Sequence, residues 1–159
     1  MPTPRQHRYD ARLVWTGASQ GPTKGYASYS REWEIAFAGK PVLRGSADPT
    51  FKGDAALHNP EELLVAALSS CHCLSYLALA ALAGIQVTDY EDAATGTMAE
   101  TGGAGHFTEV VLRPKVTIAA GLDVEKARAL HDKAHEICFI AASVNFPVRC
   151  EPAIVVAEA

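Results

Sequence analysis

The four cysteines are the residues of this chain with the most distinctive chemistry: Cys71, Cys73, Cys138 and Cys150. Cys71 lies in the middle of a long apolar segment, and Cys138 lies on the apolar stripe of a second, amphipathic segment. If both segments are helices that pack together, the two inward-facing thiols can approach to disulfide distance. Two such thiols in a reducing compartment form a candidate redox pair.

The other two cysteines are interpreted as structural. Cys73 follows Cys71 by two residues, which places it about 200° around a helix, so it points away from Cys71 and fills core space. A buried free cysteine commonly behaves as a small hydrophobe, and this interpretation stays open for Cys71 as well. Cys150 follows Arg149 beside a strand, and no pattern around it indicates a role.

A helical stripe of two histidines and a cysteine offers a competing interpretation. His131, His135 and Cys138 are spaced by four and three residues, which puts their side chains on one face of a helix, as a zinc site needs. A fourth ligand would have to come from elsewhere, for instance from Cys71. Histidines at this spacing more often lie at caps and on surfaces, so no metal or other cofactor is expected.

Two helices are expected to position the cysteines. Asn59 is a typical N-cap residue, and Pro60 suits the first helical turn. The predicted helix runs to about Ala83, where Gly84 ends it. It is apolar nearly all round, so it is interpreted as a buried central helix rather than a membrane span. A second helix is predicted over about 124–142.

Alternation of apolar and polar residues predicts strands before, between and after these helices. The predicted strands cover residues 9–16, 26–37, 41–44, 87–101, 107–118 and 153–156. This order of strands and helices is typical of an α+β fold with mostly antiparallel pairing. The parity of the second strand places Arg31 on its apolar side, where a guanidinium needs an anionic partner or a site to serve.

Length, composition and charge exclude several classes of function. The chain has 159 residues, of which 48% are hydrophobic and 20% are charged, and this predicts a single folded domain over residues 1–159. A formal net charge of −4 argues against a nucleic acid or an anionic membrane as partner. Arg5, His7 and Arg8 lie where a signal peptide needs an apolar run, so a cytoplasmic location is expected.

Two segments resemble the OsmC/Ohr family of osmotically inducible and organic-hydroperoxide-resistance proteins. The first runs from Asn59-Pro-Glu-Glu-Leu-Leu to Ala-Ala-Leu-Ser-Ser-Cys71, and the second is Ala134-His-Glu-Ile-Cys138. The resemblance implies an OsmC-like fold with two central helices in an intertwined homodimer. Phe139 stands where many family peroxidases have proline, which indicates a divergent branch of the family.

The resemblance also implies an activity, that of a thiol peroxidase that reduces organic hydroperoxides to alcohols. By motif, Cys71 resembles the peroxidatic cysteine, Cys138 the resolving cysteine, and Glu61 the glutamate of an activating arginine–glutamate pair. Attack on the peroxide leaves a sulfenic acid on Cys71, which Cys138 converts to a disulfide that an external dithiol reduces. Because Glu61 precedes Cys71 by about 15 Å along the helix axis, it must either arrive from the other subunit or act only through an arginine. The site is expected at a dimer interface.

The remaining site residues are assigned from their type and their place in the chain. Arg31 is the first candidate for the activating arginine, and Arg44 is the second. Aromatic residues are expected to line an apolar substrate pocket: Phe51, Tyr76, Phe139 and Trp33. The alternative interpretation is a non-catalytic OsmC-like protein that binds a small apolar ligand or senses redox state.

Overall fold

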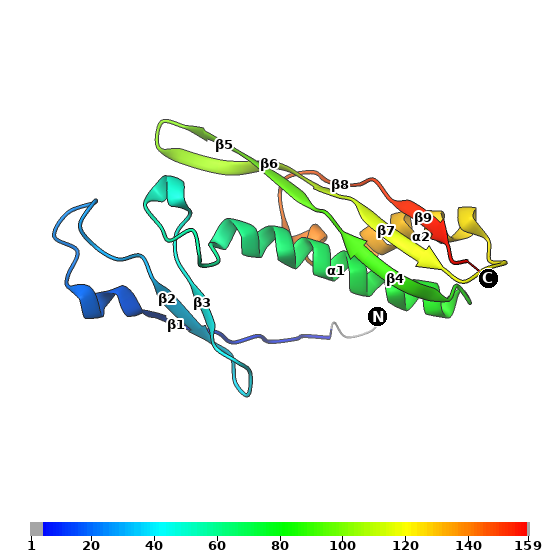
Figure 1. Ribbon diagram of the computed structural model, residues 1–159, viewed down its shortest axis with the longest axis horizontal. Coiled ribbons are helices and arrows are strands. Elements are labelled where there is room, and N and C mark those ends of the chain that lie inside the picture. Colours follow the sequence, from blue (N-terminus) through cyan, green and yellow to red (C-terminus); the bar gives the residue numbers. More distant parts are fainter. Residues whose placement is uncertain (1–4, 159) are drawn as a thin grey trace. The chain divides into compact units, whose positions relative to one another are not determined.

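The chain divides into two compact units, Met1–Leu63 and Leu64–Ala159. The structure is a computed structural model that describes residues 5–158 (Figure 1). Helix α1 (Pro60–Leu82) begins in the first unit and continues into the second. The expectation that the chain forms one domain stays a prediction.

The first unit contains a small antiparallel sheet in the order β1-β2-β3. Its elements are β1 (Arg12–Trp15), the short 3-10 helix η1 (Thr16–Gln20), β2 (Trp33–Ala36), β3 (Leu43–Gly45) and the 3-10 helix η2 (Pro49–Phe51). The second predicted strand is therefore much shorter than expected. Two hydrogen bonds shape the backbone before Trp33. The Ser28 N–H donates to the Gly25 carbonyl and closes a turn, and the Trp15 indole donates to the Ser30 carbonyl oxygen. Arg31 consequently lies outside the strand, and its assignment to a strand face is wrong.

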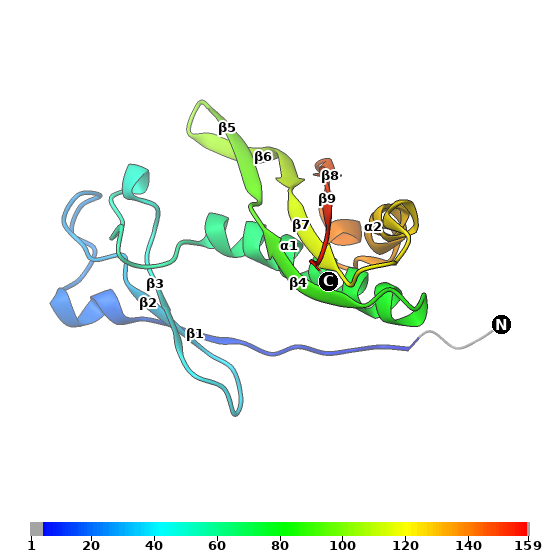
Figure 2. The same cartoon turned by 45° about the vertical axis from the view of Figure 1, so that its right-hand side comes forward.

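The second unit contains two sheets of three strands each, in the orders β4-β7-β9 and β5-β6-β8 (Figures 1 and 2). Its elements after α1 are β4 (Val87–Asp92), β5 (Thr95–Thr101), β6 (Ala104–Leu112), β7 (Pro114–Ile118), α2 (Val124–Ile137), the 3-10 helix η3 (Ala141–Ser143), β8 (Val148–Cys150) and β9 (Ala153–Val156). The β4–β7 and β5–β6 pairs are antiparallel, whereas β8 and β9 join their sheets in parallel. The α+β class and the mostly antiparallel pairing are confirmed.

Two long predicted strands prove to be two strands each. The segment 87–101 divides into β4 and β5, and the segment 107–118 divides into β6 and β7. The second break falls at Arg113, whose backbone N–H donates to the Asp92 carboxylate at 2.7 Å instead of to a strand partner. Pro114 then begins β7, as a residue without an N–H can at the first position of a strand.

The signals read from the sequence at both ends of α1 are confirmed. The Asn59 side chain accepts from Glu62 N–H at 2.8 Å, and Glu62 Oε2 accepts from Asn59 N–H at 3.4 Å, which together make a capping box. At the other end Gly84 has a φ of 75°, a left-handed conformation that glycine adopts without a steric penalty.

One face of α1 is buried, and the other faces are less covered than expected. The buried residues recur every four positions along the helix: Leu68, His72, Tyr76 and Ala80. Leu74, on another face, is 68% exposed. By length and composition alone α1 is long and apolar enough to cross a membrane, and two residues of its buried row, Tyr76 and Ala80, belong to a core cluster of the second unit.

The main core of the second unit lies where α1 and α2 meet the β4-β7-β9 sheet (Figure 2). Val116 and Ile118 are two residues apart on β7, so they point to the same face of the sheet. They pack there with Tyr76 and Ala80 of α1 and with Leu130 of α2. Both helices therefore pack against this sheet face and are held at fixed positions.

Helix α2 ends earlier than the sequence predicts. Asp123 caps its start by accepting from Lys126 N–H at 3.0 Å, but the helix stops at Ile137 rather than at residue 142. Cys138 has a ψ of 107°, which takes the chain out of the helical region. The apolar pattern continues past this break into η3, so hydrophobic spacing alone could not locate it. Cys138 is thus a C-cap residue rather than a helical one.

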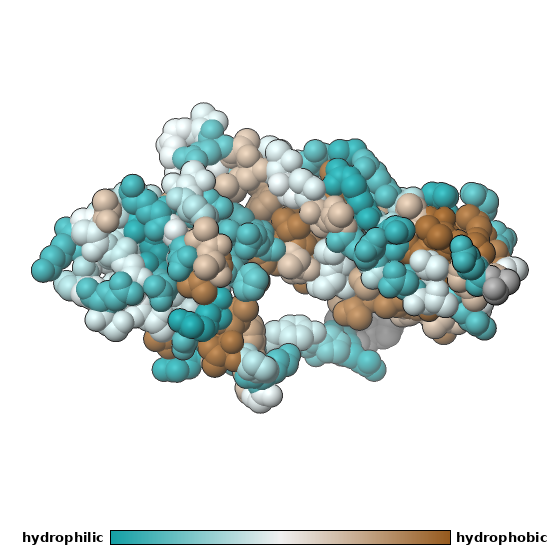
Figure 3. Space-filling model, in the orientation of Figure 1, coloured by the Kyte–Doolittle hydropathy of each residue, from teal (hydrophilic) through white to brown (hydrophobic). Residues whose placement is uncertain are grey.

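Strand β9 is an edge strand of its sheet and carries apolar side chains on the surface. Val155 and Val156 are partly exposed, and Figure 3 shows brown, apolar surface in the region of this strand. This part of the second unit therefore presents hydrophobic side chains to solvent.

Candidate active site

The structure brings Cys71 and Cys138 together within the second unit. Cys71 lies near the middle of α1, and Cys138 lies at the C-cap of α2, where its side chain is almost fully buried. Burial and a hydrogen bond with the Cys71 side chain raise the pKa of the Cys138 thiol to about 11. Cys138 is therefore a protonated thiol near neutral pH, close to the free thiol of Cys71.

Cys73 lies in a different environment from Cys71. Burial and the nearby Asp92 carboxylate raise the pKa of the Cys73 thiol. Cys73 in turn contributes to raising the pKa of Tyr90, which like Asp92 lies on β4. The side chain thus faces β4, whereas Cys71 faces the end of α2, in line with the expectation that the two cysteines point apart.

Glu61 lies in the first turn of α1, and one of its carboxylate oxygens is buried without a hydrogen-bond partner. Its neighbour Glu62 is occupied differently, because it completes the capping box and lies 3.9 Å from the His58 ring. A buried carboxylate oxygen without a donor loses its hydrogen bonds to water, and no other hydrogen bond compensates for the loss of free energy. The buried Oε2 of Glu61 can therefore accept a hydrogen bond from a cationic side chain.

Arg31 is held by its own loop in the first unit. Its guanidinium donates to the carbonyl oxygens of Tyr29, at 2.9 Å, and of Tyr26. The guanidinium carbon also lies 4.1 Å from the centre of the Tyr29 ring and 4.9 Å from that of Tyr26. Carbonyl oxygens and ring faces thus take the place of the anionic partner expected from the sequence. Arg44, the second candidate, pairs with Glu34 at 3.6 Å.

Of the four aromatic residues expected around the substrate, Tyr76 and Phe139 lie in the second unit. The Tyr76 side chain is fully buried, its hydroxyl donates to Ala127 O at 3.1 Å, and its ring stacks on His131 with centroids 4.0 Å apart. The packing of α1 on α2 thus covers the ring completely, and the expectation that Tyr76 contacts substrate stays a prediction. By contrast, Phe139 follows Cys138 directly and is 76% exposed.

The other two aromatic residues lie in the first unit. Trp33 begins β2, and its indole donates to Ser46 O at 3.1 Å. Phe51 ends η2 and is partly buried. Their part in a substrate pocket stays a prediction.

A second cluster of reactive side chains, which the sequence does not predict, lies within the second unit. His72 Nε2 and His131 Nδ1 are 3.0 Å apart, and the Cys150 sulfur is 3.5 Å from the first nitrogen and 3.8 Å from the second. These residues come from α1, α2 and β8. The helical stripe of His131, His135 and Cys138 does not form a site, because His131 turns to His72 while Cys138 contacts Cys71.

Burial sets the protonation state of this cluster. It lowers the pKa of His72, and it lowers the pKa of His131 to about 3, with a further contribution from His72. Both imidazoles are therefore neutral near pH 7. Burial, with Asp92 next in importance, raises the pKa of the Cys150 thiol to about 12. The cluster thus consists of three groups that are neutral near pH 7.

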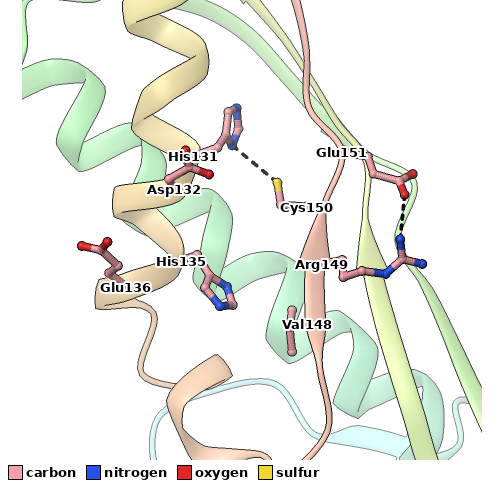
Figure 4. Close-up of a pocket in the computed structure, with 8 residues that line it drawn as sticks. All are labelled: His131, Asp132, His135, Glu136, Val148, Arg149, Cys150 and Glu151. Carbon is pink, nitrogen blue, oxygen red and sulfur yellow. Dashed lines mark hydrogen bonds and ion pairs between the residues drawn. The ribbon is translucent and has the colours of Figure 1, made fainter.

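An open hollow of about 480 Å³ adjoins the cluster (Figure 4). It is lined from α2 and from the β8 region: His131, Asp132, His135, Glu136, Val148, Arg149, Cys150 and Glu151. Figure 4 shows Cys150 projecting from β8 toward His131. The Arg149 guanidinium pairs with Glu109 at 2.9 Å and with Glu151 at 3.3 Å. Solvent can therefore reach this side of the cluster past several carboxylates.

Comparison with known proteins identifies the family. The profile of the OsmC-like protein family matches residues 53–152, which include Glu61, both cysteines of the facing pair, and the His72–His131–Cys150 cluster. A solved OsmC-like protein of unknown function from Vibrio cholerae is 33% identical, with a TM-score of 0.84 over 92% of this chain and 99% of that one. The chain therefore belongs to the OsmC-like family.

Two further proteins are similar to this chain. An organic hydroperoxide resistance protein from Elizabethkingia anophelis, solved with thiocyanate bound, is 18% identical, with a TM-score of 0.66 over 96% of this chain and all of that one. This likeness shows the shared fold. The uncharacterised protein YmaD of Bacillus subtilis is 27% identical over 90 residues, which cover 55% of this chain and 60% of YmaD.

Proposed function

We propose that this protein is a cysteine-based peroxidase that reduces organic hydroperoxides to alcohols. The observation that carries the proposal is the proximity of two free thiols, that of Cys71 in α1 and that of the buried Cys138 at the C-cap of α2. Membership of the OsmC-like family, and structural neighbours that are organic hydroperoxide resistance proteins, support the same activity.

The proposed reaction has three steps. The Cys71 thiolate attacks one oxygen of the O–O bond, and the alkoxide that leaves takes up a proton to become the alcohol. Cys71 is then a sulfenic acid, which the Cys138 sulfur attacks, so that a disulfide forms and water leaves. An external dithiol finally reduces the disulfide by exchange and returns both thiols.

Burial of Cys138 supports the same two roles that the sequence motifs suggest. Because its pKa is raised to about 11, Cys138 stays protonated and is a poor first nucleophile near neutral pH. It becomes useful after Cys71 is oxidised, when it already lies in contact with the sulfur that it must reach. Cys71 is thus the attacking residue and Cys138 the resolving one.

A cation is needed to stabilise the Cys71 thiolate. None of the groups that shift the pKa of Cys138 is a basic side chain, so in this proposal the cation comes from another part of the chain or from a second chain. The unpartnered buried oxygen of Glu61 provides a place where a guanidinium can be held. We assign this role to Arg31, with Arg44 as the second candidate, in a homodimer of the kind that is typical of OsmC/Ohr proteins.

The substrate preference can be tested by comparing two peroxides. Cumene hydroperoxide should react at least about tenfold faster than hydrogen peroxide, because burial of its apolar group stabilises the bound state.

Phe139→Ala should raise KM for cumene hydroperoxide and leave the rate with hydrogen peroxide unchanged, since the exposed ring follows the resolving cysteine directly. Phe37→Ala, in the first unit, is the matched control. Equal rates with both peroxides would remove the apolar pocket from the proposal.

A further inference from the structure

The His72–His131–Cys150 cluster is separate from the proposed peroxidase chemistry. Its three side chains come from α1, α2 and β8, and the two histidines are each 1% exposed. Neither histidine takes part in the contact between Cys71 and Cys138. We propose that this cluster is a binding site for one divalent transition-metal ion of the Zn²⁺ class. The proposal replaces the expectation, drawn from the sequence, that the protein holds no metal.

The spacing of the three candidate ligand atoms matches tetrahedral coordination. With zinc–nitrogen bonds of about 2.0–2.1 Å and a zinc–sulfur bond of about 2.3 Å, two nitrogens lie roughly 3.3 Å apart and a nitrogen and a sulfur roughly 3.6 Å. The observed distances are 3.0 Å between the nitrogens and 3.5 and 3.8 Å from sulfur to nitrogen. A single ion therefore fits with side-chain shifts of a few tenths of an ångström.

The surrounding structure holds the ligands in place without the ion. His131 is stacked on the buried Tyr76 ring, whose hydroxyl is fixed to the Ala127 carbonyl. The rings of His72 and His131 lie nearly parallel, with an angle of 10° between them. In the absence of an ion, only one proton can occupy the space between the facing nitrogens, so at most one imidazole donates there. A metal ion uses the lone pairs of both nitrogens.

The donor set selects the class of metal. Two imidazole nitrogens and one thiolate favour Zn²⁺ and its chemical relatives over Mg²⁺ or Ca²⁺, which prefer oxygen ligands. Binding replaces the thiol proton of Cys150 by the metal, and that proton leaves to solvent. Three protein ligands leave a fourth position, and the hollow lined by Cys150, His131 and Asp132 gives water or a small ligand a route to it (Figure 4).

The experiment uses the full-length protein after treatment with a chelator. Zn²⁺ is titrated in competition with a chromophoric chelator, and Co²⁺ is titrated separately, because a cobalt–thiolate bond gives a charge-transfer band in the near ultraviolet. The expected result is one metal ion per chain and a cobalt–thiolate band. Cys150→Ser should weaken Zn²⁺ binding by at least about 100-fold, since loss of even an outer-shell partner costs about 10- to 100-fold.

Two further measurements keep the test decisive. Cys73→Ser is the matched control, because it removes a partly buried thiol from the same helix as His72 and should leave affinity and band unchanged. In the unaltered protein, Zn²⁺ should protect Cys150 from alkylation, as mapped by peptide mass, which requires no variant to fold. The proposal is overturned by the absence of stoichiometric metal, by equal affinity in Cys150→Ser, or by protection of Cys71 and Cys138 in place of Cys150. None of these outcomes depends on peroxidase activity.

Discussion

Cys71→Ser is expected to lower the turnover of organic hydroperoxides by at least about 1,000-fold, because a serine hydroxyl at its ordinary pKa is a poor nucleophile. The substitution exchanges one atom in a helix whose other contacts remain, so the fold should be retained. Loss of cumene hydroperoxide, followed by a peroxide-specific dye in the presence of excess dithiothreitol, measures the effect. Circular dichroism of both proteins checks that the helices are intact.

Cys73→Ser is the matched control for this variant. It changes the same residue type two positions along α1, on the side that faces Asp92 and Tyr90, and should retain full turnover. If Cys71→Ser and the unaltered protein consume peroxide at the same rate, Cys71 is not the attacking residue. If neither consumes peroxide, the alternative of a non-catalytic ligand-binding or redox-sensing protein takes the place of the proposed function.

Cys138→Ser is expected to have a different effect, namely a single turnover. Cys71 can still attack the peroxide and release one alcohol per chain, but no thiol lies beside the resulting sulfenic acid to resolve it. Further peroxide then oxidises Cys71 to the sulfinic acid, which ordinary thiols do not reverse. Intact mass should show the addition of one oxygen atom and then of two, while the rate falls to zero after the first turnover.

A buried hydroxyl in place of the Cys138 thiol can keep the hydrogen bond to Cys71, so the site should be little disturbed. Dimedone, which reacts with sulfenic acids, should label the variant at Cys71 after one equivalent of peroxide. Normal cycling of Cys138→Ser with the same dithiol would show that this residue does not resolve the intermediate.

The parts of the fold that depend on local chemistry could be predicted from the sequence. The capping residues Asn59 and Gly84 set the ends of α1 through hydrogen bonds and backbone angles that depend on a few neighbouring residues. The end of α2 could not be predicted in this way. Its apolar spacing continues beyond Cys138, although the backbone leaves the helix there.

The main feature that the sequence does not predict is the His72–His131–Cys150 cluster, whose residues come from distant elements. The sequence indicates that Cys71 and Cys138 both face inward, and it predicts that the two thiols approach each other if their helices pack together. His72 lies on the same buried row as Leu68 and Tyr76, a position where a histidine needs a polar partner. That partner comes from α2, and Cys150 comes from a short strand that the sequence does not reveal. Only the three-dimensional packing assembles the cluster.

The expectation for Arg31 shows a different limit of the sequence. Strand parity predicts an apolar face for Arg31, where it needs an anionic partner or a site to serve. The chain instead turns before β2 and supplies carbonyl oxygens and tyrosine rings. A guanidinium has several donors and two faces, so residues within its own loop can satisfy it. Its proposed partnership with Glu61 therefore depends on contacts that the sequence pattern does not specify.

The central claim is that the sulfur of Cys71 is oxidised by a hydroperoxide and then captured by Cys138. The most direct measurement is the intact mass of the reduced protein after one equivalent of cumene hydroperoxide, followed by peptide mapping without a reductant. The account predicts the loss of two hydrogen atoms and a single cross-linked peptide pair that joins Cys71 to Cys138. An unchanged mass, or a disulfide that involves Cys73 or Cys150 instead, would contradict it.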